Sequence, residues 1–137
     1  MKLQPYLFFE GRAEEAIEFY SSAMGAEVVQ MIRFGDSPEQ PPAGSMPEGY
    51  QRKVMHASLK VGESLLLLSD GGCSGASAFR GCSISLFAAD TAEAERLFAT
   101  LAEDGEVQMP LTKTFFSPAF GMLADRFGVP WMVVAER

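Results

Sequence analysis

The sequence predicts an α+β protein built from two tandem βαβββ modules. Three observations predict this fold class. The order strand, helix and three strands occurs twice, the chain matches itself at a shift of 79 residues, and the closing hairpins match at a shift of 66 residues. The 137 residues have the usual length of one domain. We expect a single domain over 1–137, with module one over about 1–70 and module two over about 79–137.

The first module begins with a predicted strand, LQPYLFF, over 3–9. A helix is expected over 12–24, because its apolar residues recur at the spacing of one buried stripe, and Gly25 suits the position after a helix end. Strands are expected over 27–34, 51–61 and 64–70, the last two joined tightly at Gly62 and Glu63. The Pro- and Gly-rich stretch 36–49 predicts a lid or a dimer contact, with plain disorder as the alternative.

The second module begins with a predicted strand over 82–89, followed by a helix that starts at Asp90. Asp90 is a favourable N-cap, and Glu93 stands at the third helical position. Three strands are expected over 106–116, 119–127 and 130–136. Asp125 is expected to bond its own turn backbone, and strand alternation directs Trp131 into the core.

The internal matches indicate a duplication. The shift of 79 pairs Leu7 with Leu86, and the shift of 66 pairs Gly62 with Gly128. Sheets of this kind carry helices on one face. We therefore expect one curled mixed sheet with helices on the outer face, whose other face encloses a cleft between the modules.

Charge and composition exclude several classes of partner. The formal net charge of −7 repels phosphate backbones and anionic lipid surfaces, so neither nucleic acid nor a membrane is expected as a partner. The same negative charge favours a neutral or cationic ligand. No run approaches the ~20 apolar residues of a membrane span, and the apolar start is too short for a signal peptide, so a cytoplasmic location is expected. Cys73 and Cys82 lack metal or redox spacing, which predicts free, buried or half-buried thiols.

Three stretches carry a family resemblance: PYLFFEGRAEEAIEFYSSAMGAEV, VMHASLKVGESLLLLSD and EDGEVQMPLTKTFFSPAFGMLADRFGVPWMV. With them the chain resembles the vicinal oxygen chelate superfamily, which includes glyoxalase I, bleomycin resistance proteins and extradiol dioxygenases. More narrowly it resembles the PhnB-like branch, often labelled as related to 3-demethylubiquinone 3-methyltransferase. The resemblance covers nearly the whole chain. It implies paired βαβββ modules and a homodimer.

The resemblance also implies where a metal ion would bind, from the first and last strands of each module. Those positions fall on Pro5, Leu66, Ser83 or Ile84, and Met132. None carries a His, Cys or carboxylate ligand, so neither a metal nor another cofactor is expected. The expected pocket instead presents apolar surface, which favours an apolar ligand. Its predicted lining is Pro5, His56, Leu66, Ser83, Phe116 and Met132.

His56 is the only histidine and the best catalytic candidate. Three interpretations stay open: a strand histidine bonded to a neighbour, a pocket residue that recognises ligand or acts as acid and base, and a metal ligand. Phe115, Phe116 and Phe120 form a cluster that either stacks on a ligand or packs in the core. The PhnB-like pattern usually has tryptophan where Phe116 stands.

The sequence therefore leads to a metal-free small-molecule-binding protein, similar to the bleomycin resistance proteins. The alternative is a superfamily enzyme of lyase, isomerase or dioxygenase type that uses His56 or an ion at a displaced site. A purely structural or regulatory dimer is a third hypothesis. Methyl transfer finds no support, because no glycine-rich loop follows a first parallel strand.

Overall fold

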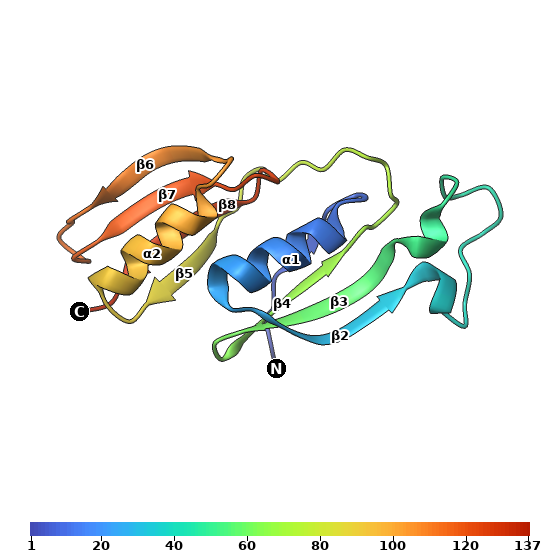
Figure 1. Cartoon of the computed structure of the whole chain (residues 1–137), viewed down its shortest axis with the longest axis horizontal. Coiled ribbons are helices and arrows are strands. Elements are labelled where there is room, and N and C mark those ends of the chain that lie inside the picture. Colours follow the sequence, from blue (N-terminus) through green and yellow to red (C-terminus); the bar gives the residue numbers. More distant parts are fainter. The chain divides into compact units, whose positions relative to one another are not determined.

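The computed structural model describes all residues, 1–137, which divide into two compact units, Met1–Ser77 and Ala78–Arg137 (Figure 1). The first unit contains β1 (Tyr6–Phe8), α1 (Ala13–Met24), β2 (Glu27–Arg33), the short 3₁₀ helices η1 (Phe34–Asp36) and η2 (Tyr50–Arg52), β3 (Val54–Val61) and β4 (Ser64–Ser69). The second contains β5 (Ile84–Ala88), α2 (Thr91–Leu101), β6 (Glu106–Thr112), β7 (Phe120–Ala124) and β8 (Pro130–Ala135). The predicted βαβββ order is confirmed in each unit.

Each unit forms its own four-stranded mixed sheet. The strand orders are β1-β4-β3-β2 and β5-β8-β7-β6, so the topology repeats. The pairs β1–β4 and β5–β8 are parallel, and the other pairs are antiparallel. The α+β fold class is confirmed, but the backbone hydrogen bonds make two sheets, one per module, where one sheet was expected.

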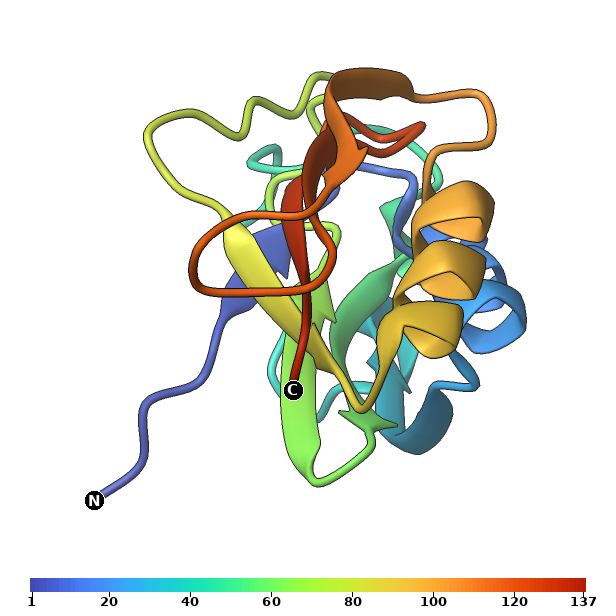
Figure 2. The same cartoon turned by 90° about the vertical axis from the view of Figure 1, so that its left-hand side faces the viewer.

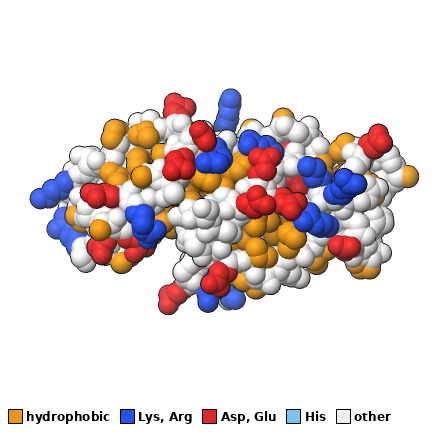
Figure 3. Space-filling model, in the orientation of Figure 1, with side chains coloured by type: hydrophobic (Ala, Val, Ile, Leu, Met, Phe, Trp, Pro, Cys, Tyr) orange, Lys and Arg blue, Asp and Glu red, His pale blue; other side chains and the backbone are white.

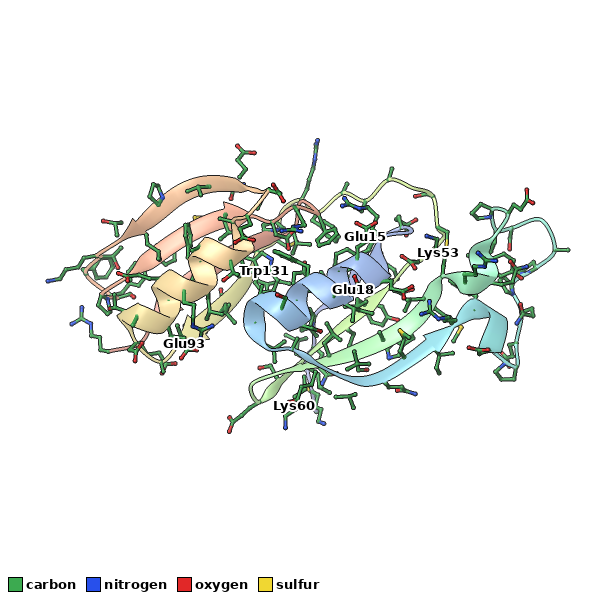
Figure 4. The ribbon with its side chains drawn as sticks, viewed as in Figure 1. Glu15, Glu18, Lys53, Lys60, Glu93 and Trp131 are labelled. Atoms are coloured by element: carbon green, nitrogen blue, oxygen red, sulfur yellow. The ribbon has the colours of Figure 1, made fainter.

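Helix α1 covers one face of the first sheet. Strand alternation places every second side chain on this face, and Leu7, Leu59 and Leu68 there are at most 8% exposed. Tyr20 of α1 meets Phe9, which follows β1, edge to face with ring centroids 6.2 Å apart. The opposite surface of α1 is acidic and exposed, as Glu15 and Glu18 show in Figure 4. The core of this unit therefore lies between α1 and the sheet.

The start of α1 is capped from a distance. Its N-cap residue, Arg12, makes no side-chain cap bond. Instead Asp70, directly after β4, accepts hydrogen bonds from the backbone N–H groups of Gly11, Ala13 and Val54, each at 2.8 Å. The helix ends, as predicted, at Gly25 in the left-handed conformation. Asp70 thus ties the helix start to β3 and β4.

Helix α2 packs against the second sheet in the same way (Figures 1 and 2). Asp90 caps it, as predicted, by accepting a bond from the Glu93 N–H at 2.8 Å. Phe98 packs where Gly121 lacks a side chain, since a Cβ there would lie 2.7 Å from the Phe98 ring. The close approach of α2 to β7 therefore depends on that glycine.

Asp125 and Trp131 also take their predicted places. Asp125 Oδ1 accepts from the N–H groups of Phe127 and Val129, so it bonds its own turn. Its Oδ2 accepts from Trp131 Nε1 at 2.9 Å, and Trp131 is 2% exposed (labelled in Figure 4). Both residues belong to the core of the second unit.

The sheet registers correct one detail of the internal duplication. Leu7 pairs with Leu68, and its counterpart Leu86 pairs with Val133, which follows Leu68 by 65 residues and not by 66. A one-residue difference matters because it moves a side chain to the other face of a sheet. Met132 therefore corresponds to Leu67, and not to Leu66 as the sequence comparison indicated.

The stretch 36–49 is hydrogen-bonded to residues that precede and follow it in the chain. Gln40 Nε2 donates to the carbonyl oxygens of Phe34 and Ser37, and the Tyr50 hydroxyl donates to Gln40 Oε1 at 3.0 Å. Phe34 and Tyr50 also meet edge to face. A lid or dimer contact in this segment stays a prediction.

Two further expectations concern the cysteines and membrane-spanning segments. Both cysteines are free, as predicted, but Cys82 is exposed and only Cys73 is half-buried, because Cys82 lies in the irregular segment before β5. Neither helix is long and apolar enough to cross a membrane. Figure 3 shows acidic and basic side chains interspersed on the face in view, with apolar side chains between them.

Candidate functional site

The face of the first sheet that α1 does not cover carries a cluster of aromatic and hydroxyl side chains. We call Tyr6, Phe8, His56, Ser58 and Ser69 the polar face. Register brings them together: Tyr6 and Ser58 both pair with Leu67, and Phe8 pairs with Ser69. They alternate with the buried residues of β1, β3 and β4, so they point away from the helix.

His56 is bonded through both ring nitrogens. Its Nδ1 lies 2.7 Å from the Tyr6 hydroxyl oxygen, and its Nε2 lies 3.2 Å from Ser58 Oγ. A neutral imidazole has one donor and one acceptor nitrogen, and each hydroxyl can play either part. The three side chains therefore form a continuous hydrogen-bonded chain, whichever tautomer is present. This fits the expectation of a strand histidine bonded to neighbours, and the same chain can hold or relay a proton.

The rings of the polar face offer a stacking surface. Tyr6 and Phe8 stack with centroids 5.1 Å apart and an interplanar angle of 18°. They stay 40% and 51% exposed, whereas Ser58 and Ser69 beneath them are buried. Burial raises the pKa of Tyr6, and a hydrogen bond from Ser69 partly offsets the rise. The Tyr6 phenol is therefore neutral, and able to donate, at ordinary pH.

The uncovered face of the second sheet has a different chemistry. We call Met109, Met122, Met132, Phe116 and Phe120 the thioether face. Met109 pairs with Met122, which pairs with Met132, so the three methionines form one row across β6, β7 and β8. Phe116 contacts Phe120 with centroids 5.1 Å apart. This face is apolar and partly exposed.

The residues predicted to line a pocket lie in different places. His56 lies on the polar face, and Pro5 precedes β1, where its carbonyl oxygen accepts from the Leu67 N–H. Leu66 is 4% exposed and faces α1, so it does not share a face with His56. The other three belong to the second unit.

Phe116 and Met132 lie on the thioether face, and Phe115, Phe116 and Phe120 are in contact as a cluster, as expected. Ser83 precedes β5 with its hydroxyl buried and without a hydrogen-bond partner. The structure thus brings together two of the predicted lining residues of module two. A pocket role for each of the six stays a prediction.

Sequence reasoning missed four members of the polar face: Tyr6, Phe8, Ser58 and Ser69. A signal was present, because the shift of 79 matches the apolar Leu7 with Leu86, and alternation then turns Tyr6 and Phe8 to the opposite side. Under the shift of 79 their counterparts are Ser85 and Phe87. The count back from the helix placed the functional position at Pro5, one residue too early for this face.

No group of three or more His, Cys, Asp or Glu side chains is arranged to hold a metal ion. A hollow of about 680 Å³ lies elsewhere in the first unit, beside the start of α1 and η2. Two of its charged side chains are bonded: Lys53 Nζ donates to the Gly11 carbonyl oxygen at 2.9 Å, and Glu14 accepts two bonds from Arg33. Arg33 thereby lowers the pKa of Glu14.

Comparison with known proteins shows the family of the chain. The family model described as 3-demethylubiquinone-9 3-methyltransferase matches residues 1–134. The chain belongs to this family. It is 36% identical to protein YjdN of Escherichia coli K12, over 97% of this chain and 94% of YjdN.

Solved structures extend the family match to the fold. The crystal structure of protein PA1353 from Pseudomonas aeruginosa is 46% identical, with a TM-score of 0.86, over 99% of this chain and 98% of that one. A putative 3-demethylubiquinone-9 3-methyltransferase, PhnB protein, from Bacillus cereus is 28% identical with a TM-score of 0.79, over 99% and 100%. A glyoxalase-related enzyme from Fulvimarina pelagi, 16% identical over 99% and 88%, shares the fold with a TM-score of 0.59. The chain is thus similar over nearly its whole length to a PhnB protein, and it shares its fold with a glyoxalase-related enzyme.

Proposed function

We propose that this PhnB-like protein binds a small, largely apolar, neutral or cationic molecule, and that binding needs no divalent metal ion. One observation carries the proposal: two stacked and exposed rings, Tyr6 and Phe8, lie beside the hydrogen-bonded chain of His56 and Ser58. Exposed aromatic rings next to a few convergent polar groups are typical of ligand sites. The net charge of −7 disfavours an anionic ligand.

The proposal does not include methyl transfer, despite the family description. In both sheets only one strand pair is parallel, and the first strand is followed by a helix that Asp70 or Asp90 caps. Doubly wound parallel sheets hold nucleotide cofactors by leaving a glycine-rich helix start open to the ligand. Here a carboxylate already occupies the corresponding backbone N–H groups.

The test is a titration of the full chain with Nile red, an uncharged apolar dye, in the presence and absence of EDTA. We expect saturable binding that EDTA leaves unchanged and that Phe8→Ala weakens about tenfold, since loss of a stacked ring removes ~1.5 kcal/mol. Phe115→Ala is the matched control, because Phe115 is a 92% exposed ring in the other unit. Binding that EDTA abolishes, or that responds only to Phe115→Ala, would refute the proposal.

A second candidate, acid–base catalysis at His56, is favoured by the distances from its two nitrogens to Tyr6 and Ser58. A base held in place by a third group is the usual arrangement for proton transfer. The probe is 5-nitrobenzisoxazole, which loses a carbon-bound proton to a positioned base. Turnover that His56→Ala abolishes and Tyr6→Phe reduces would support catalysis, and a rate equal to that of buffer would exclude it for this substrate class.

A further inference from the structure

The three methionines of the thioether face occupy directly paired positions on neighbouring strands. Met109 pairs with Met122 across β6 and β7, and Met122 pairs with Met132 across β7 and β8. Side chains so paired start about 4.5–5.5 Å apart and project from the same face. The fourth strand completes the row with Ser85, whose hydroxyl donates to Met132 Sδ at 3.8 Å. Three methionines and one serine therefore occupy one row across the sheet, and the Met132 sulfur atom is turned toward Ser85.

These sulfur atoms can converge on a common point. The outer methionines start from strands separated by two interstrand spacings, about 10 Å, and each side chain has three rotatable bonds beyond Cα. Metal–sulfur bonds are about 2.3 Å long, so three sulfur ligands around one ion lie about 4 Å apart. Met122 and Met132 are half-buried and Met109 is 41% exposed, which leaves the row open to an ion from solvent.

The chemistry of the row selects a soft ion. Thioethers bind Cu(I) and similar soft ions, whereas Mg²⁺, Ca²⁺ and Mn²⁺ prefer oxygen ligands. No carboxylate or imidazole stands in the row. Phe120 lies two residues before Met122 on the same face of β7 and contacts Phe116. An aromatic face close to the row adds cation–π stabilisation for a monovalent ion.

We propose that Met109, Met122 and Met132 form a binding site for one soft monovalent metal ion, Cu(I), or Ag(I) as its redox-inert analogue. The site lies wholly within the second unit and does not depend on the polar face. It differs from the divalent ion excluded under the proposed function, both in ligand type and in position.

The test uses the full chain carrying ¹³C-methyl methionine, in a Cys73→Ser, Cys82→Ser background, because free thiols also bind soft ions. Ag(I) is added in steps and the methyl resonances of all eight methionines are followed. We expect only the resonances of Met109, Met122 and Met132 to shift, with saturation at one equivalent. Met122→Leu, which keeps the side-chain volume, should weaken binding by at least about tenfold.

The matched control is Met55→Leu in β3, which should leave Ag(I) binding unchanged. Urea unfolding of both leucine variants verifies that they fold. Competition with bicinchoninate under anaerobic conditions repeats the measurement with Cu(I) itself. Shifts of all eight methyl groups in parallel, no shift at one equivalent, or equal binding by Met122→Leu would each overturn the proposal, and none of these results would affect dye binding at the polar face.

Discussion

Single side chains hold this fold together through buried carboxylates that serve several backbone groups at once. Asp70 accepts three backbone N–H bonds, and Asp125 accepts two together with the Trp131 ring N–H. The two residues are 1% and 3% exposed. Removing such an acceptor leaves several buried donors unsatisfied, which costs far more than the loss of a surface bond.

Asp125→Ala should therefore lower the free energy of unfolding by about 3 kcal/mol. Urea denaturation followed by Trp131 fluorescence measures the change, because the indole is 2% exposed in the folded chain and meets water on unfolding. Asp36→Ala is the control, since Asp36 is exposed, and it should change stability by no more than about 0.5 kcal/mol. Equal stability of both variants would contradict the structural role of Asp125.

Ionisation of Tyr6 makes the free energy of unfolding depend on pH in the alkaline range. Burial raises its pKa in the folded chain above the ordinary value of 10.0. Below that pH the phenol is neutral in both states, so it contributes no pH dependence. Above it the phenol of the unfolded chain ionises first, and ionisation then draws the equilibrium toward unfolding.

The measurement for Tyr6 is urea denaturation at about pH 9 and about pH 11. The native chain should lose more stability between these values than Tyr6→Phe, because the variant lacks this ionisation. An identical loss in both proteins would show that Tyr6 ionises equally in the folded and unfolded states.

At the scale of the element, packing of each helix on its sheet decides which face remains open. α2 approaches β7 closely because Gly121 leaves room for the Phe98 ring, and backbone atoms of β6 lie at 3.0–3.1 Å on other sides of the same point. Local sequence predicted both helices, the end of α1 at Gly25 and the Asp90 cap of α2. It did not predict the Asp70 cap of α1, because Asp70 is distant in sequence. It extended several strands too far, as with 106–116 against Glu106–Thr112, because strand ends depend on partners distant in sequence.

Gly121→Ala should destabilise the protein by about 1–3 kcal/mol, because the new methyl group overlaps the Phe98 ring. Phe98→Leu removes the ring atoms in question, so the double variant should lose less stability than the sum of the single variants. Thermal or urea unfolding of the four proteins gives this coupling. Simple additivity would show that the two residues do not compete for the same space.

At the scale of the whole molecule, the chain repeats one module and gives its two open faces different chemistry. The repeat itself could be predicted from sequence, because residues 79 apart match. Which side chains lie on each open face was harder to predict. Aligning the last strands of the two modules with an offset of 66 in place of 65 put Leu66 in the expected site, although Leu66 packs under α1. Because side chains alternate between the two faces of a sheet, an error of one residue in the offset selects the opposite face. Hydroxyl partners such as Ser58 were therefore overlooked.

We predict that the chain forms a homodimer. Edge strand β2 exposes Val28 and Val29, which are 49% and 60% accessible, and β6 exposes Val107 at 46%. Exposed apolar side chains on unpaired strand edges favour association. Sedimentation equilibrium should give a mass about twice the 14.9 kDa of one chain, and Val29→Lys should lower it. A mass of one chain at all concentrations would contradict this prediction.

Native mass spectrometry of the freshly purified full chain, joined with elemental analysis, shows whether an apolar ligand binds without a divalent ion. We predict an organic molecule of low mass bound to the chain, released by Phe8→Ala, with no divalent metal in stoichiometric amount. Stoichiometric divalent metal that is retained through purification and lost in His56→Ala would contradict it.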